Sequence, residues 1–134
     1  MTILVAEDDA DDRFLIQTAF EEKGYADKLD FVENGVELIS YLADKGKDHM
    51  PRIILLDLNM PKKDGRQVLR ELKQHELFKR IPIVVFTTTK NENEISRCYD
   101  LGANTYIVKP TTFNELLFLV EQIHSYWLNA AAVI

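Results

Sequence analysis

Short apolar runs alternate with amphipathic segments five times along the chain, and this alternation limits the fold more than any other feature. The apolar runs are rich in Val, Ile and Leu and predict buried strands. They lie in residues 2–6, 28–34, 53–57, 81–89 and 104–110. The segments between them carry apolar residues at helical spacing and predict helices. These helices are expected over about 11–23, from 35 onward, 66–75, 91–102 and 112–127.

Regular alternation of strand and helix predicts a parallel sheet, because each parallel pair of strands needs a crossover connection. We expect a flavodoxin-like, doubly wound α/β domain with five parallel strands in the order 2-1-3-4-5 between two layers of helices, a (βα)5 sandwich. Functional groups in such folds gather outside the carboxyl ends of the strands, near the point where the strand order reverses.

Length and composition fit one globular domain. The chain has 134 residues, of which 46% are hydrophobic and 28% charged. We expect a single domain over 1–134 with a core at about 2–128, an apolar tail at 129–134 and no output domain. A single cysteine, Cys98, fits a reducing cytoplasm. The net charge of −6 argues against direct binding of nucleic acid, and no apolar stretch is long enough to span a membrane.

Polar and charged residues stand where the predicted strands end. The residues concerned are Glu7, Asp8 and Asp9 after the first strand, Asp57 after the third, Thr87 in the fourth and Lys109 in the fifth. Each signal alone has an ordinary explanation: acids favour a helix N-terminus, and threonine is common in strands. Their shared position at strand ends makes a functional site the better interpretation.

Several carboxylates crowded together repel one another and stay ionised only beside a cation. Oxygen ligands without sulfur or imidazole favour Mg²⁺. We expect Asp8 and Asp57 each to give one oxygen, the backbone carbonyl of Asn59 a third, and Glu7 to act through a water molecule. The positions left open would accept phosphoryl oxygens.

An aspartate can attack phosphorus as a nucleophile and form an acyl phosphate. Asp57 is the candidate nucleophile. Lys109 would neutralise the charge on the phosphoryl oxygens together with the metal, and Thr87 offers a hydroxyl donor.

The segments ILVAEDD, DLNMPKKDG, VVFTT and TYIVKP occur in this order along the chain, and in this they resemble the receiver domain of two-component response regulators. The resemblance implies that Asp57 accepts a phosphoryl group from a sensor histidine kinase or a phosphotransfer protein, with Glu7 and Asp8 as the acidic pocket. It implies Thr87 as a switch hydroxyl and Tyr106 as the aromatic ring that moves inward after phosphorylation.

The same resemblance implies a cis peptide bond between Lys109 and Pro110, which a proline permits at low cost. The stretches TTT and LGANTYIVKP are similar to single-domain regulators, of the chemotaxis type and of the type paired with bacterial phytochromes. One residue departs from the family pattern: Thr88 stands where alanine or glycine is usual, and a larger side chain there is expected to slow self-dephosphorylation.

Two other functions remain as alternatives. An aspartate-nucleophile phosphohydrolase of the haloacid dehalogenase type needs a second aspartate two residues after the nucleophile, where this chain has Asn59. A receiver that is not phosphorylated would not need the complete acidic pocket. The leading prediction is therefore a phosphoacceptor signalling protein, not a metabolic enzyme.

A signal would leave the domain through the face formed by the fourth helix, the fifth strand and the fifth helix, as the resemblance implies. The last helix carries an apolar stripe for the core, whereas Phe118 and Leu119 fall outside that stripe. Apolar residues on an outward side suggest a partner or a homodimer through this face. The downstream target cannot be identified from the sequence.

Overall fold

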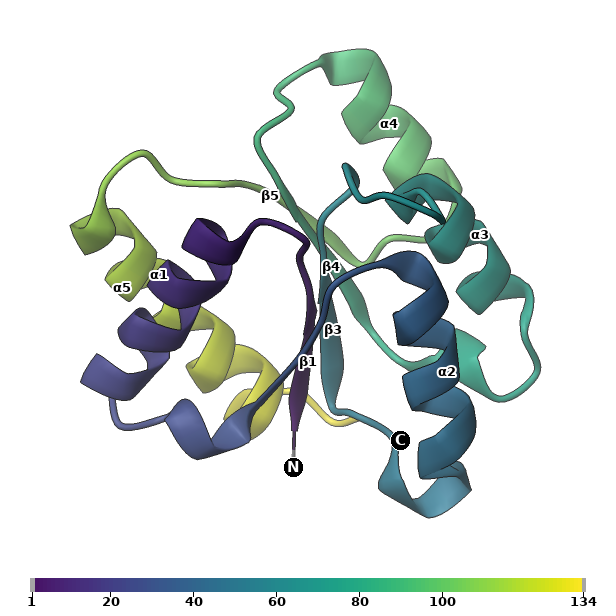
Figure 1. The fold of residues 1–134 in the computed structure, drawn as a ribbon, viewed down its shortest axis with the longest axis horizontal. Helices are drawn as coiled ribbons and strands as arrows, with labels where there is room; N and C mark the ends of the chain where they lie inside the picture. The colour runs from purple at the N-terminus through teal and green to yellow at the C-terminus, as the bar shows by residue number, and fades with distance from the viewer. Residues whose placement is uncertain (1, 134) are drawn as a thin grey trace.

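The computed structural model describes residues 2–133 as a five-stranded sheet between two layers of helices (Figure 1). All strands run parallel in the order β2-β1-β3-β4-β5. Their bounds are β1 Ile3–Ala6, β2 Leu29–Val32, β3 Ile53–Leu56, β4 Ile83–Thr87 and β5 Thr105–Val108. The predicted fold class and strand order are confirmed.

Helices cover both faces of the sheet. Their bounds are α1 Ala10–Glu22, α2 Gly35–Lys45, α3 Gly65–Gln74, α4 Glu92–Asp100 and α5 Phe113–Ile123. Figure 1 shows α1 and α5 on one side of the sheet and α2, α3 and α4 on the other. Three short 3₁₀ turns, Ala26–Lys28, Lys47–His49 and Phe78–Arg80, lie in the connections.

Alternate strand residues divide the hydrophobic core into two layers. Leu4 and Leu56 pack with residues of α2, α3 and α4, whereas Ile3 and Leu55 pack with residues of α1 and α5. Successive side chains of a strand point to opposite faces, so a sheet covered on both faces needs continuous apolar runs. Fully burying a side chain of this kind contributes about 1.5–3 kcal/mol. The central strands β1 and β3 are buried at every position.

Polar side chains begin each of the five helices, and this fixes where the helices start. Each N-cap side chain accepts a hydrogen bond from a backbone N–H of the first turn. The capping residues are Asp9, Asn34, Asp64, Asn91 and Thr112. Because these caps directly follow strands or short loops, they hold the ends of the helices close to the carboxyl edge of the sheet.

The C-terminal segment, predicted as an apolar tail at 129–134, begins in helical structure. The helix continues beyond α5 as a π-helical segment, His124–Ala130. The guanidinium of Arg52 donates hydrogen bonds to the carbonyl oxygens of Trp127 at 3.0 Å and Ala131 at 2.8 Å. This part of the tail is therefore attached to the domain, and Ile134 lies outside the described residues.

Within residues 2–133, no helix is both long and apolar enough to cross a membrane.

Candidate functional site: an acidic pocket at the carboxyl edge of the sheet

The predicted site residues meet at one edge of the sheet because the strand ladder continues into them. The N–H of Glu7 donates to the carbonyl of Val32 at 3.0 Å, and the N–H of Asp57 donates to the carbonyl of Ala6 at 3.1 Å. The N–H of Lys109 donates to the carbonyl of Thr87 at 2.8 Å. The backbone of all three residues is thus held by neighbouring strands.

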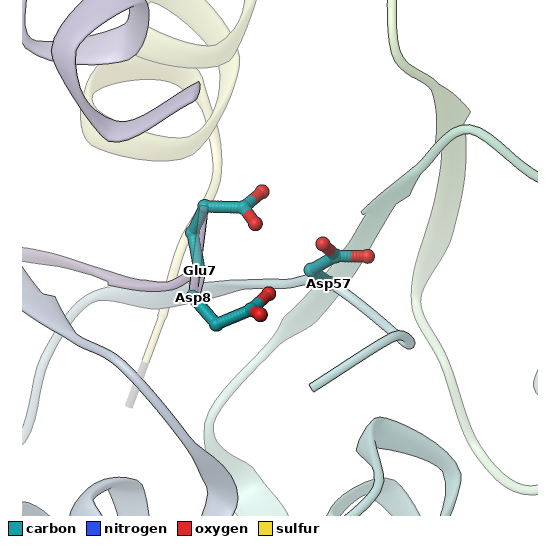
Figure 2. A group of neighbouring side chains, drawn as sticks. All are labelled: Glu7, Asp8 and Asp57. Atoms are coloured by element: carbon teal, nitrogen blue, oxygen red, sulfur yellow. The ribbon is translucent and has the colours of Figure 1, made fainter. Parts of the chain in front are cut away.

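Three carboxylates form the centre of the site. Glu7, Asp8 and Asp57 each place an oxygen within 4.8 Å of the others, and Figure 2 shows the carboxylates of Glu7 and Asp8 extending toward Asp57. Glu7 and Asp57 are buried, whereas Asp8 is exposed. The structure thus brings together the three carboxylates that the sequence analysis named as the acidic pocket.

Lys109 supplies the positive charge of the site. Its ammonium contacts carboxylate oxygens of Glu7 at 2.5 Å, Asp12 at 2.8 Å and Asp57 at 3.2 Å. An ammonium has three N–H donors. In this geometry each of them faces a different carboxylate.

Burial and neighbouring charges shift the pKa values of Glu7 and Lys109. Burial, reinforced by the nearby charge of Asp57, raises the pKa of Glu7 to about 7 although Lys109 acts in the opposite direction. For Lys109, burial acts to lower the pKa, but hydrogen bonds to Asp12 and Glu7 outweigh it and the pKa rises. The lysine is therefore a permanent cation, and the acidic pocket favours a further positive charge.

The donor set fits a hard divalent cation. The three side chains of the cluster offer only oxygen atoms, which Mg²⁺ and Mn²⁺ prefer. Close to this cluster, the N–H of Asn59 donates to Asp57 Oδ1 at 3.2 Å. That bond orients Asp57, while a ligand role for the Asn59 carbonyl and a water-mediated role for Glu7 stay predictions.

Thr87 is the last residue of β4, and Tyr106 lies in the neighbouring strand β5. The Thr87 side chain is fully buried, and its hydroxyl has no hydrogen-bond partner among the described residues. A buried hydroxyl without a partner costs free energy, so this hydroxyl is suited to donate a hydrogen bond to a ligand that binds beside it. The Tyr106 hydroxyl donates to the carbonyl of Thr89 at 2.8 Å.

The predicted cis peptide between Lys109 and Pro110 is wrong for this structure, since residues 2–133 contain no cis peptide bond. Lys109 reaches the acidic pocket without it. Its backbone is aligned by the bond to Thr87, and its long side chain covers the remaining distance to Asp57.

Two residues near the site were missed from the sequence. Asp12 contacts Lys109 from the first turn of α1, and Arg13 donates from Nη1 to the carbonyl of Glu7 at 2.9 Å. Asp12 lies in the first turn of α1, which begins two residues after Asp8. No sequence signal singled it out, because several acids stand together at this helix start and each fits an ordinary role at a helix N-terminus.

Curated relatives cover nearly the whole chain. The probable methanogenesis regulatory protein FilR2 of Methanothrix harundinacea is 38% identical over 129 residues, which cover 95% of this chain and 83% of FilR2. The response regulator Rcp1 of Synechocystis sp. is 37% identical over 134 residues, which cover 98% of this chain and 91% of Rcp1.

Solved structures share the fold closely. The phosphorylated cyanobacterial phytochrome response regulator RcpA has a TM-score of 0.88 and 40% identity, covering 98% of this chain and 96% of RcpA. The Mn²⁺-bound form of Rcp1 has a TM-score of 0.85 and 36% identity, covering 99% of this chain and 98% of Rcp1. The receiver domain of the sensor histidine kinase PA1611 from Pseudomonas aeruginosa, with magnesium in its active-site cleft, has a TM-score of 0.72 and 25% identity, covering 95% and 96%.

These comparisons agree with the site geometry and with the resemblance that the motifs predicted. The family consists of signalling domains of two-component systems and not of metabolic enzymes. A family model described as the response regulator receiver domain matches residues 3–121, and the chain therefore belongs to the response regulator receiver domain family.

Proposed function

We propose that this protein accepts a phosphoryl group on Asp57 from a histidine kinase or a phosphotransfer protein, in a reaction that requires Mg²⁺. The observation that carries the proposal is the position of Asp57. It follows a fully buried strand, lies in the three-carboxylate cluster and has the Lys109 ammonium 3.2 Å from one of its oxygens.

In the proposed reaction, a carboxylate oxygen of Asp57 attacks the phosphorus of a phosphohistidine. The new P–O bond forms as the P–N bond breaks, and the imidazole nitrogen of the donor keeps the electron pair. Lys109 stabilises the negative charge on the transferring group. Bound Mg²⁺ would contribute further charge neutralisation at the phosphoryl oxygens, held by Asp8, Asp57 and, through water, Glu7.

The phosphoryl group would then act as the acceptor for the Thr87 hydroxyl. Thr87 already has a buried and unpartnered hydroxyl among the described residues, so a hydrogen bond to a phosphoryl oxygen removes an energetic cost. Movement of Thr87 would free space for Tyr106, whose hydroxyl would leave the carbonyl of Thr89. We propose that this change alters the face formed by α4, β5 and α5.

The same face is a candidate dimer contact. Phe118 in α5 has 63% of its surface exposed, whereas Leu119 is half-buried. A large exposed aromatic side chain is suited to a contact with a second copy. Relatives that serve phytochromes support a phytochrome-type kinase as the partner to test first.

The experiment that tests the function is labelling with acetyl phosphate and Mg²⁺, followed by intact-mass measurement. Wild-type protein should gain one alkali-labile phosphoryl group, and Asp57→Asn should gain none. Omitting Mg²⁺ should also prevent labelling. Labelling of Asp57→Asn to the wild-type extent would contradict the proposal, and turnover of varied phosphate esters would indicate a hydrolase.

The dimer contact is tested by size-exclusion chromatography of the phosphorylated protein. Phe118→Glu should elute later than wild type, as a monomer. Phe14→Glu is the matched control, because Phe14 has 69% of its surface exposed but lies on α1. An unchanged elution volume for Phe118→Glu would count against the contact.

A further inference from the structure

Asp12 is a carboxylate beside the reaction site that the proposed chemistry does not use. It lies outside the group Glu7, Asp8 and Asp57 that fits a cation. Its Oδ2 atom nevertheless lies 2.8 Å from Lys109 Nζ, closer than the oxygen of Asp57 at 3.2 Å. Asp12 contributes strongly to the raised pKa of Lys109.

The backbone around Asp12 is held in place at several points. Asp9 Oδ1 accepts hydrogen bonds from the N–H groups of Asp11 at 2.8 Å and Asp12 at 3.0 Å. The next residue, Arg13, is bonded through its N–H to the carbonyl of Asp9 and through its guanidinium to the carbonyl of Glu7. The first turn of α1 is thereby fixed to the end of β1, so the Asp12 carboxylate is presented from a rigid support.

The three partners of Lys109 have different fates during phosphorylation. Asp57 becomes the acyl phosphate, so a phosphoryl oxygen takes its place as a partner of the Lys109 ammonium. Glu7 faces the proposed cation. Asp12 is the partner that neither reacts nor belongs to the cation group, and it can keep its contact throughout.

We propose that Asp12 is a positioning residue that holds the Lys109 ammonium in place for the phosphoryl group. A lysine side chain has considerable rotamer freedom, and fixing it before the reaction lowers the barrier. This inference rests on the proposed phosphorylation of Asp57. It predicts that α1, although it carries no reacting group, sets the reactivity of the site.

The test compares Asp12→Ala with Asp11→Ala in acetyl phosphate labelling with Mg²⁺. Both substitutions remove one acid from the first turn of α1, so they change net charge and helix-dipole interactions alike. Asp11 is exposed and makes no contact with Lys109 among the contacts of the described residues. Asp12→Ala should be labelled about fivefold more slowly than wild type, and Asp11→Ala at the wild-type rate.

Two further measurements separate positioning from a general structural effect. In a Lys109→Ala background, adding Asp12→Ala should not slow the residual labelling further, because the group that Asp12 holds is gone. The Mg²⁺ affinity of Asp12→Ala should equal that of Asp11→Ala, whereas the affinity for beryllofluoride, a phosphoryl mimic, should fall about fivefold. Asp12→Glu should recover part of the lost rate.

Equal labelling rates for Asp12→Ala and Asp11→Ala would overturn the inference while leaving Asp57 as the phosphoacceptor. Equal slowing by Asp12→Ala with and without Lys109 would overturn it as well. Wild-type protein that takes no label would instead overturn the proposed function, and the inference with it. Asp12→Asn, which keeps the side-chain shape, guards against an unfolded alanine variant and should also be slowed.

Discussion

At the scale of single residues, Thr88 directly follows β4 and so lies at the same edge of the sheet as Asp57, which directly follows β3. Thr88 is exposed, so its side chain faces the solvent from which a hydrolytic water would come. The chemistry of the site could be predicted from the sequence at this scale because each residue type has a narrow set of roles. The partner of Lys109 on α1 could not, because contacts between residues 97 positions apart depend on the packing of the helix on the sheet.

Replacement of Thr88 by alanine should speed self-dephosphorylation. The smaller side chain leaves more room for water in line with the Asp57 acyl phosphate, and we expect an increase of about two- to fivefold in the hydrolysis rate. Loss of the phosphorylated mass with time after removal of the donor measures this rate. Ser96→Ala, which removes an exposed hydroxyl from α4, is the control. Equal or slower loss in Thr88→Ala would contradict the role of Thr88.

Replacement of Gly65 by alanine should damage both stability and phosphorylation. A Cβ atom there would lie 2.5 Å from the carbonyl oxygen of Asp57 and 2.6 Å from the Cα of Leu58, so the backbone that carries the proposed phosphoacceptor must shift. We expect a loss of about 1–3 kcal/mol in the free energy of unfolding, measured with urea, and slower labelling.

Gly24 provides the comparison for this variant. It has φ +81° and open space around its missing Cβ. Gly24→Ala should cost about 1 kcal/mol through backbone strain, without any change in labelling. A normal labelling rate in Gly65→Ala would show that the close approach to Asp57 has no functional importance.

Helices and strands were predictable to different degrees. The strands were located well because each is a short apolar run that ends at a polar residue, as Leu56 ends β3 before Asp57. The last helix was expected to end at about residue 127, and the structure extends it to Ala130 through the segment His124–Ala130. The hydrogen bonds from Arg52 that hold this end could not be read from its apolar residues. The trans geometry before Pro110 was also missed, because the family resemblance and not the local sequence had suggested a cis bond.

The start of α2 gives a prediction about a helix cap. Asn34 has only 5% of its surface exposed, and its side chain accepts a hydrogen bond from the N–H of Glu37 at 2.9 Å. Asn34→Ala should lower the free energy of unfolding by about 1–2 kcal/mol, whereas Asn34→Ser, which keeps an oxygen acceptor for the N–H of Glu37, should retain most of it. Urea unfolding followed by far-UV circular dichroism measures both. Equal losses in the two variants would mean that the cap contributes little.

On the scale of the whole molecule, the acidic pocket links folding to cation binding. Carboxylates held together by the fold repel each other until a cation binds, and the unfolded chain does not hold them together. Phosphorylation and folding should therefore depend on the same three side chains at one edge of the sheet.

Mg²⁺ at ten times its dissociation constant should raise the free energy of unfolding by about 1.4 kcal/mol, and a chelator should remove the gain. Thermal unfolding with and without Mg²⁺ measures the change. In Asp8→Asn the gain should be largely lost, because that carboxylate belongs to the cation group. Asp44→Asn, an exposed acid on α2, should behave as wild type. If Mg²⁺ stabilised Asp8→Asn as much as wild type, the ion would bind at another site.

The hydrogen bonds that fix Glu7, Asp57 and Lys109 to neighbouring strands involve main-chain atoms alone. The shape of this edge therefore depends on the backbone, whereas its reactivity depends on the side chains. A variant that has lost its reactive side chain can keep the shape of the active protein. In a cell that contained both, an Asp57→Asn copy would occupy the kinase without receiving anything from it. Such a copy would act as a dominant decoy, and its abundance relative to the wild type would set how much of the signal is silenced.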